Sequence, residues 1–137
     1  MIEINYIAVL VAAVAAYAVG ALWYGFLFKK KWGELMGYPP ALDHVRAIPA
    51  LTPALSMTIG FFTTLLMVYV LAHFVVLVNI ATIGGAIQLG FWVWLGFQLP
   101  LIAHQVLYEN RKLTLFAINL SHQFVAMLVA SIILVLF

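Results

Sequence analysis

The residues of this sequence best suited to chemistry are two histidines, His104 and His122, which lie among amide side chains inside long apolar segments. Gln98 and Gln105 are seven residues apart and share one face of a helix, and Asn119 shares a face with His122. Neutral groups of this kind can hydrogen-bond a ligand or a neighbouring helix, and imidazoles can also bind a metal ion.

The composition places these side chains in a membrane. Of 137 residues, 67% are hydrophobic and 7% are charged, whereas a globular domain carries about 25% charged residues. This excludes a water-soluble enzyme and a disordered linker. A net charge of +2 predicts no nucleic-acid partner, and the absence of cysteine excludes disulfides and thiolate metal sites.

Four segments are long and apolar enough to cross a bilayer, which needs about 20 residues of helix. They cover residues 4–28, 51–78, 82–108 and 113–137. The sequence therefore predicts an all-α integral membrane four-helix bundle, forming one transmembrane domain with a longer connection at 29–50. The short turns after the second and third segments predict that consecutive spans are antiparallel neighbours. Pro100 predicts a kink in the third span.

The basic residues indicate the orientation, because lysine and arginine are retained on the cytoplasmic side. All six fall in the first and third connections, which lie on one side of a four-span protein, and the other side has none. We expect both termini outside and a location in the plasma (inner) membrane of a bacterium. The six residues are Lys29, Lys30, Lys31, Arg46, Arg111 and Lys112.

With this topology, each of the four spans places polar side chains in the cytoplasmic half, while His73, near the outer end of the second span, lies apart. We therefore expect one polar cluster there, formed by Trp23, Tyr24, Ser56, Gln98, His104, Gln105, Asn119 and His122.

Three interpretations of this cluster stay open. Its members could join helices through hydrogen bonds of about 0.6 kcal/mol each, or they could line a pocket for a small molecule. His104 and His122 could also bind haem or a metal, or serve a membrane enzyme. We predict no catalytic residues, cofactor or metal, and favour a non-enzymatic protein, because the sequence contains no Gly-x-Ser-x-Gly or His-Glu-x-x-His motif.

Small residues spaced by four form a smooth stripe along the first span: Ala8, Ala12, Ala16 and Gly20. Such stripes allow close helix packing in lipid, so we expect a contact within the bundle or between subunits of a homo-oligomer. A faint internal echo relates residues 20–26 of the first span to residues 90–97 of the third, both with a Trp-x-Gly-Phe core.

The chain also resembles a bacterial membrane family, domain of unknown function 1761. The resemblance rests on Gly20-Ala21-Leu22-Trp23-Tyr24, Phe28, Lys31, Trp32, Met36, Gly37, Tyr108-Glu109-Asn110-Arg111, Leu115-Phe116, Ile118-Asn119 and His122. It implies a small four-helix membrane protein without an assigned activity. It also directs attention to the cytoplasmic turn with Tyr108, Glu109 and Arg111, which either anchors the fourth span or borders an inner pocket.

The leading functional hypothesis is a small carrier or ligand-binding protein for an apolar or weakly polar molecule, surrounded by membrane lipids. The alternative is a non-catalytic accessory or scaffold subunit of a membrane complex, in which the polar cluster only joins helices.

Overall fold

The structure, a computed structural model, describes residues 3–28, 30–31 and 53–137. Four of its helical segments are long and apolar enough to cross a membrane: Tyr6–Leu27, Ala54–Leu77, Ile83–Leu107 and Leu113–Leu136. The predicted all-α class and the four spans are thereby confirmed. Most of the predicted 29–50 connection lies outside the described residues, including Lys29, Trp32, Met36, Gly37 and Arg46.

Two of the four spans are composite helices. The first span joins α1 (Tyr6–Leu22) to a π-helix, η1 (Trp23–Leu27). The second span is a single helix, α3 (Pro53–Leu77). The third consists of α4 (Ile83–Val93), the π-helix η2 (Trp94–Gln98) and α5 (Leu99–Leu107). The fourth is α6 (Leu113–Leu136).

Short polar side chains begin two of these helices. The side chains of Asn5 and Thr82 accept hydrogen bonds from the backbone N–H groups of Ala8 and Gly85, at 3.2 and 3.0 Å. These bonds satisfy donors that the first turn of a helix leaves without partners.

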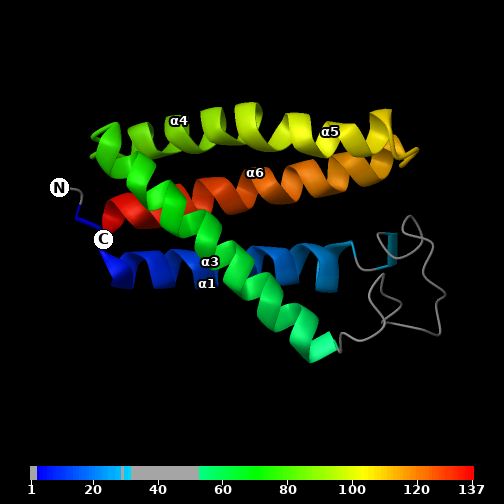
Figure 1. The fold of residues 1–137 in the computed structure, drawn as a ribbon, viewed down its shortest axis with the longest axis horizontal. Helices are drawn as coiled ribbons and strands as arrows, with labels where there is room; N and C mark the ends of the chain where they lie inside the picture. The colour runs from blue at the N-terminus through cyan, green and yellow to red at the C-terminus, as the bar shows by residue number, and fades with distance from the viewer. Residues whose placement is uncertain (1–2, 29, 32–52) are drawn as a thin grey trace.

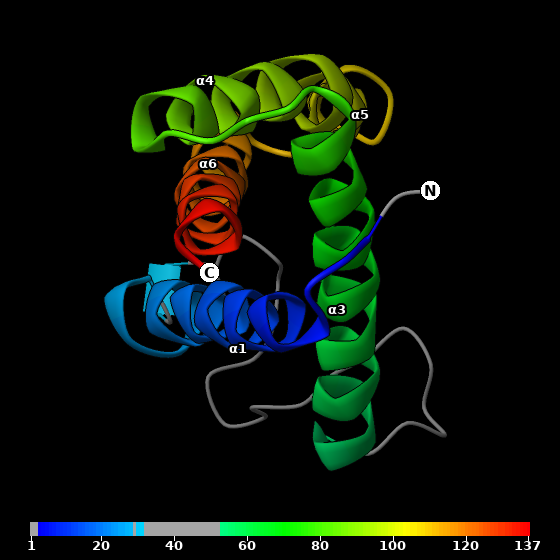
Figure 2. The same cartoon turned by 90° about the vertical axis from the view of Figure 1, so that its left-hand side faces the viewer.

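The α6 helix occupies the centre of the arrangement. It runs between α1 on one side and the α4–η2–α5 helix on the other, and antiparallel to both (Figure 1). The α3 helix crosses this layer at a steep angle and packs against α1 and α6 (Figure 2).

This crossing corrects the expectation that spans two and three pack as antiparallel neighbours. Although only a short turn connects them, α3 diverges from α4 (Figures 1 and 2). The reason lies in the face that α3 buries: Val68 and Leu71 pack against small residues of α1 and against Met127 of α6.

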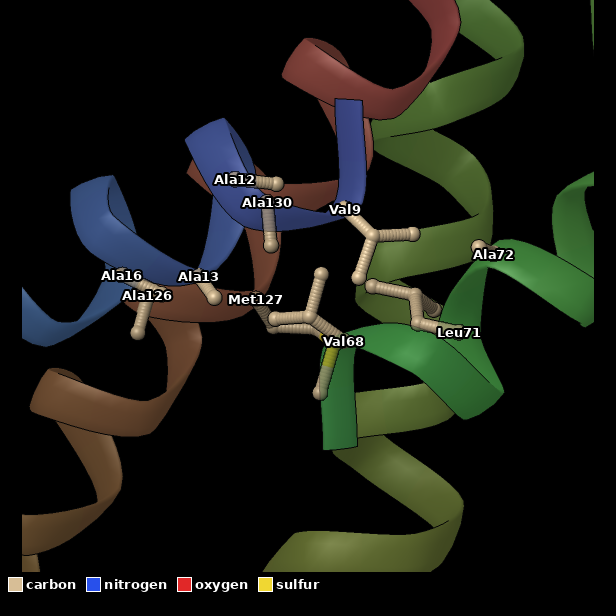
Figure 3. Close-up of a cluster of buried hydrophobic side chains, with 10 residues drawn as sticks. All are labelled: Val9, Ala12, Ala13, Ala16, Val68, Leu71, Ala72, Ala126, Met127 and Ala130. Atoms are coloured by element: carbon tan, nitrogen blue, oxygen red, sulfur yellow. The ribbon is translucent and has the colours of Figure 1, made fainter. Parts of the chain in front are cut away.

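The core lies where α1, α3 and α6 meet (Figure 3). Ala12 and Ala16 belong to this core, Ala8 is buried near the start of α1, and Gly20 lies against a side chain of α6. The small-residue stripe therefore forms a contact within the chain, where it lets α1 approach α6 closely. The homo-oligomer stays a prediction that does not rest on this stripe.

The disturbance expected at Pro100 takes the form of the π-helix η2, which ends just before α5. Pro100 then stands in the first turn of α5, directly after η2. The wider turn of η2 thus accommodates the proline without breaking the span.

The two ends of the described chain lie side by side. The side-chain amide of Asn5 donates to the backbone oxygen of Phe137 at 3.0 Å, and both ends lie at the same side of the bundle (Figure 1). We call this side the terminal end. The opposite side, with Lys30, Lys31 and the 108–112 turn, is the loop end.

Candidate functional site

Tyr24, in η1, connects the first span to α6 near the loop end. Its hydroxyl lies 2.7 Å from Oδ1 of Asn119 and donates to it. Its ring meets the His122 imidazole edge to face, with 5.0 Å between ring centroids. The same imidazole lies against Gly20 of α1, one turn before Tyr24. The structure therefore brings together Tyr24, Asn119 and His122 of the predicted cluster.

Two tryptophans attach the π-helices to a single turn of α6. Trp23 of η1 donates its indole N–H to Oγ of Ser121 at 3.2 Å. Trp94 of η2 donates its indole N–H to the backbone oxygen of Leu120 at 3.0 Å. These residues begin the Trp-x-Gly-Phe segments of the sequence echo, so the echo marks two π-helices that flank α6. Short π-helical segments often occur at functional sites.

Gln98, the last residue of η2, extends the polar contacts across α6. Its amide nitrogen donates to Oε1 of Gln123 at 3.2 Å and to the sulfur of Met67 on α3 at 3.4 Å. Gln98 thereby joins three helices at the level of Tyr24 and His122. Its own Oε1 is buried without a hydrogen-bond partner among the described atoms.

A partly open cavity of about 430 Å³ lies between α1, α3 and α6. This volume falls within the range of about 300–1,000 Å³ typical of small-molecule pockets. None of the described residues that line it carries a formal charge. Those residues are Ala16, Tyr17, Gly20, Ala21, Tyr24, Met57, Gly60, Thr63, Thr64, Met67, His122, Gln123 and Ala126.

His122 combines a position on this cavity with an unsatisfied ring nitrogen. Its Nδ1 is buried and has no hydrogen-bond partner in the part of the chain that the structure covers. Leaving a buried polar atom unpaired costs about 1–3 kcal/mol. The role of holding helices together does not account for this cost, because a paired or apolar side chain would serve that role better.

Of the eight predicted cluster members, only Tyr24 and His122 line the cavity. Trp23, Gln98 and Asn119 do not line it but hydrogen-bond to its neighbours within the bundle. The other three lie apart from it. Ser56 is half-buried near the start of α3, and Gln105 is half-buried on α5. His104 is exposed, and its ring centroid lies 5.6 Å from that of Tyr108, which follows the end of α5. The structure thus groups His122 with Tyr24 and not with His104.

The predicted cytoplasmic turn is exposed. Tyr108, Glu109 and Arg111 all lie on the surface, and the backbone N–H of Arg111 donates to the oxygen of Gln105 at 3.0 Å. The structure shows these residues closing the connection between α5 and α6, apart from the residues that line the cavity.

Sequence reasoning missed the wall that α3 contributes. Gly60, Thr63 and Thr64 line the cavity, and the signal for them was a glycine followed by two adjacent hydroxyl residues inside an apolar span. Tyr17 of α1 was also missed, because one tyrosine in a membrane helix does not by itself indicate a site.

Metal binding gains no support from the arrangement. Across residues 3–28, 30–31 and 53–137, no three His, Cys, Asp or Glu side chains come together as a ligand group. The residues that line the cavity with His122 carry aromatic, amide and hydroxyl groups, and such groups suit hydrogen bonding to an uncharged organic molecule.

Residues 7–135 match the family described as Protein of unknown function (DUF1761). The match covers nearly the whole chain, so the protein belongs to this family and is a four-span membrane protein. No curated protein and no solved structure matches it.

Proposed function

We propose that this member of the DUF1761 family binds, and carries within the membrane, a small apolar or weakly polar molecule in the cavity between α1, α3 and α6. The observation that supports this most is the cavity itself, because about 430 Å³ of space is lined by uncharged residues, among them Tyr24 and His122. A cavity with apolar walls and a few polar groups is the usual form of a small-molecule site.

The uncharged lining limits the class of ligand. A charged molecule in this cavity would lose its hydration without gaining an ionic partner, which is costly in a medium of low dielectric constant. Tyrosine rings and the methionines Met57 and Met67 offer polarizable apolar contacts instead. These properties favour a neutral ligand that enters from the lipid phase.

The orientation follows from the basic residues. We propose that the loop end faces the cytoplasm and the terminal end the outside of a bacterial inner membrane, because Lys30, Lys31, Arg111 and Lys112 all lie at the loop end. The cavity then lies toward the cytoplasmic half, where Tyr24 and the first half of α3 line it.

Native mass spectrometry of the protein released from its own membrane tests the binding function. We expect a stoichiometric small-molecule mass that is not a phospholipid. Gly60→Leu should abolish it, because a leucine there extends from the wall into the cavity, beside Tyr17. Gly84→Leu is the matched control, since nothing in the described part of the chain lies within 4 Å of a Cβ at Gly84 and this residue does not line the cavity.

Two results would overturn the proposal. A wild-type protein that carries only phospholipid would show that the cavity holds no specific molecule. A small molecule retained equally by Gly60→Leu and wild type would show that it binds elsewhere.

A further inference from the structure

The hydroxyl groups on the α1 and α3 side of the cavity all point their protons into the protein. Thr63 and Thr64 donate to the backbone oxygen of Gly60, at 2.8 and 3.0 Å. Tyr17 of α1 donates to the backbone oxygen of Met57, at 2.7 Å. All of these residues line the cavity. A carbonyl oxygen only accepts, so the direction of the three bonds is fixed.

A hydroxyl has one proton and two lone pairs. Once the proton is committed to a backbone carbonyl, the oxygen can only accept from a ligand. Redirecting the proton would break a bond inside the helix or between helices, in surroundings without water to replace it. We call Tyr17, Thr63 and Thr64 the acceptor wall.

The α6 side of the cavity has the opposite character. The side-chain oxygen of Gln123 already accepts a hydrogen bond from Gln98. The two N–H groups of the Gln123 amide remain as donors for a ligand. The His122 ring has one donor and one acceptor nitrogen when neutral, so the donors on this side are those of Gln123. The cavity therefore presents acceptors on α1 and α3 and the Gln123 amide donors on α6.

We propose, building on the binding function above, that the ligand carries an uncharged hydroxyl group, most simply that of an amphipathic phenol. A hydroxyl can donate to the acceptor wall and accept from the α6 side at once, which no ether, ester or ketone can do. The rings of Tyr17 and Tyr24 on the cavity favour an aromatic molecule. A carboxylate is doubly unfavourable, because it brings a charge and no proton for the acceptor wall.

A pair of matched probes tests this inference: a tritium-labelled para-alkylphenol and its methyl ether, each titrated against the full chain in lipid nanodiscs. Protein-free nanodiscs correct for partition into lipid. We expect the phenol to bind about tenfold more tightly, as one hydrogen bond in a dry site provides. Gly60→Leu should remove binding of both probes.

The acceptor wall predicts which variants remove the preference. The double substitution Thr63→Val and Thr64→Val keeps the shape of both side chains and removes their oxygens, so the affinity for the phenol should fall toward that of the ether. Thr58→Val is the control, because Thr58 donates to Ala54 in the same way but does not line the cavity.

The outcomes separate the two proposals. Equal binding of phenol and ether, both sensitive to Gly60→Leu, would overturn the hydroxyl specificity and leave the binding function standing. Tighter binding of the ether would do the same. A third outcome is that neither probe binds in a way that Gly60→Leu abolishes. If the native protein then retains a small molecule that has no exchangeable hydrogens, the hydroxyl specificity also fails. If the native protein retains no small molecule either, both proposals fail.

Discussion

The His122 imidazole lies so close to Gly20 that a Cβ on this glycine would be 3.1 Å from Nε2. Tyr24, one turn further along the first span, meets the same ring. The first span therefore positions His122 by contact on two successive turns, and no described atom hydrogen-bonds to Nδ1. The geometry of the cavity depends on the absence of a side chain at position 20.

The substitution Gly20→Ala should displace the imidazole by a few tenths of an ångström and weaken binding of the phenol probe several-fold. Little loss of stability is expected, because the atom displaced is at the far end of a side chain that can rotate, and alanine gains about 1 kcal/mol of helix propensity over glycine. Equilibrium binding and unfolding in mixed micelles measure the two effects separately.

Gly25→Ala provides the comparison for this experiment, since no atom of the described residues lies within 4 Å of a Cβ at Gly25. It should leave binding unchanged. If Gly20→Ala and Gly25→Ala bind the probe equally well, His122 does not belong to the binding site.

Gly90 should respond differently from Gly20, because its close neighbours are less able to move. A Cβ there would lie 3.0 Å from Oγ of Ser131 and 3.3 Å from the backbone oxygen of Met127. We expect Gly90→Ala to destabilise the protein by about 1–3 kcal/mol through overpacking, whereas Gly84→Ala should not destabilise it.

A double variant identifies the cause. Ser131 is buried and its hydroxyl has no partner among the described atoms, so Ser131→Ala alone should be neutral or slightly stabilising. Combined with Gly90→Ala, it should restore part of the lost stability. A strictly additive double-mutant cycle would show that the two residues do not interact.

The tryptophans of the two π-helices should contribute to stability in parallel. Trp23→Phe and Trp94→Phe each remove an indole N–H bonded to α6 and leave a small void, at a cost of about 1 kcal/mol each. Trp92→Phe is the control, because Trp92 is 64% exposed on α4. Equal unfolding free energies for all three variants would show that the indole bonds to α6 carry no stability.

The sequence was sufficient to predict the four spans, because length and hydropathy alone determine whether a helix can cross a bilayer. It also predicted that Tyr24, Asn119 and His122 fall at one depth. Depth follows from counting residues along antiparallel helices, so the meeting of α1 and α6 near the loop end could be anticipated.

The remaining features depend on rotation and crossing angle, which residue counting does not determine. His104 lies at a suitable depth but faces outward on α5, because η2 changes the helical register before it. The acceptor wall was missed because it depends on α3 crossing α1 steeply. The echo between residues 20–26 and 90–97 was visible, yet only the structure shows that both of its Trp-x-Gly-Phe cores are π-helical.

The orientation can be measured directly, because the chain has no cysteine of its own. Ala81→Cys, in the α3–α4 turn at the terminal end, should react with a membrane-impermeant maleimide in intact spheroplasts. Glu109→Cys, in the turn at the loop end, should react only after permeabilisation. The reverse pattern would overturn the proposed orientation, and reaction of both residues from outside would contradict four spans.

The α3–α4 turn itself depends on an unusual backbone conformation at Asn79, which has a φ of 60°. The N–H groups of Asn79 and Ile80 donate to the backbone oxygens of Val76 and Val75, at 3.1 and 2.9 Å. This is the Schellman arrangement, whose left-handed position glycine and asparagine adopt most easily.

Asn79→Gly should therefore keep or slightly raise the free energy of unfolding. Asn79→Ala should lower it by about 1 kcal/mol, because a Cβ without a compensating polar group disfavours this conformation. Unfolding of both variants in mixed micelles measures the difference, and equal stability of the glycine and alanine variants would show that the left-handed turn does not constrain the end of α3.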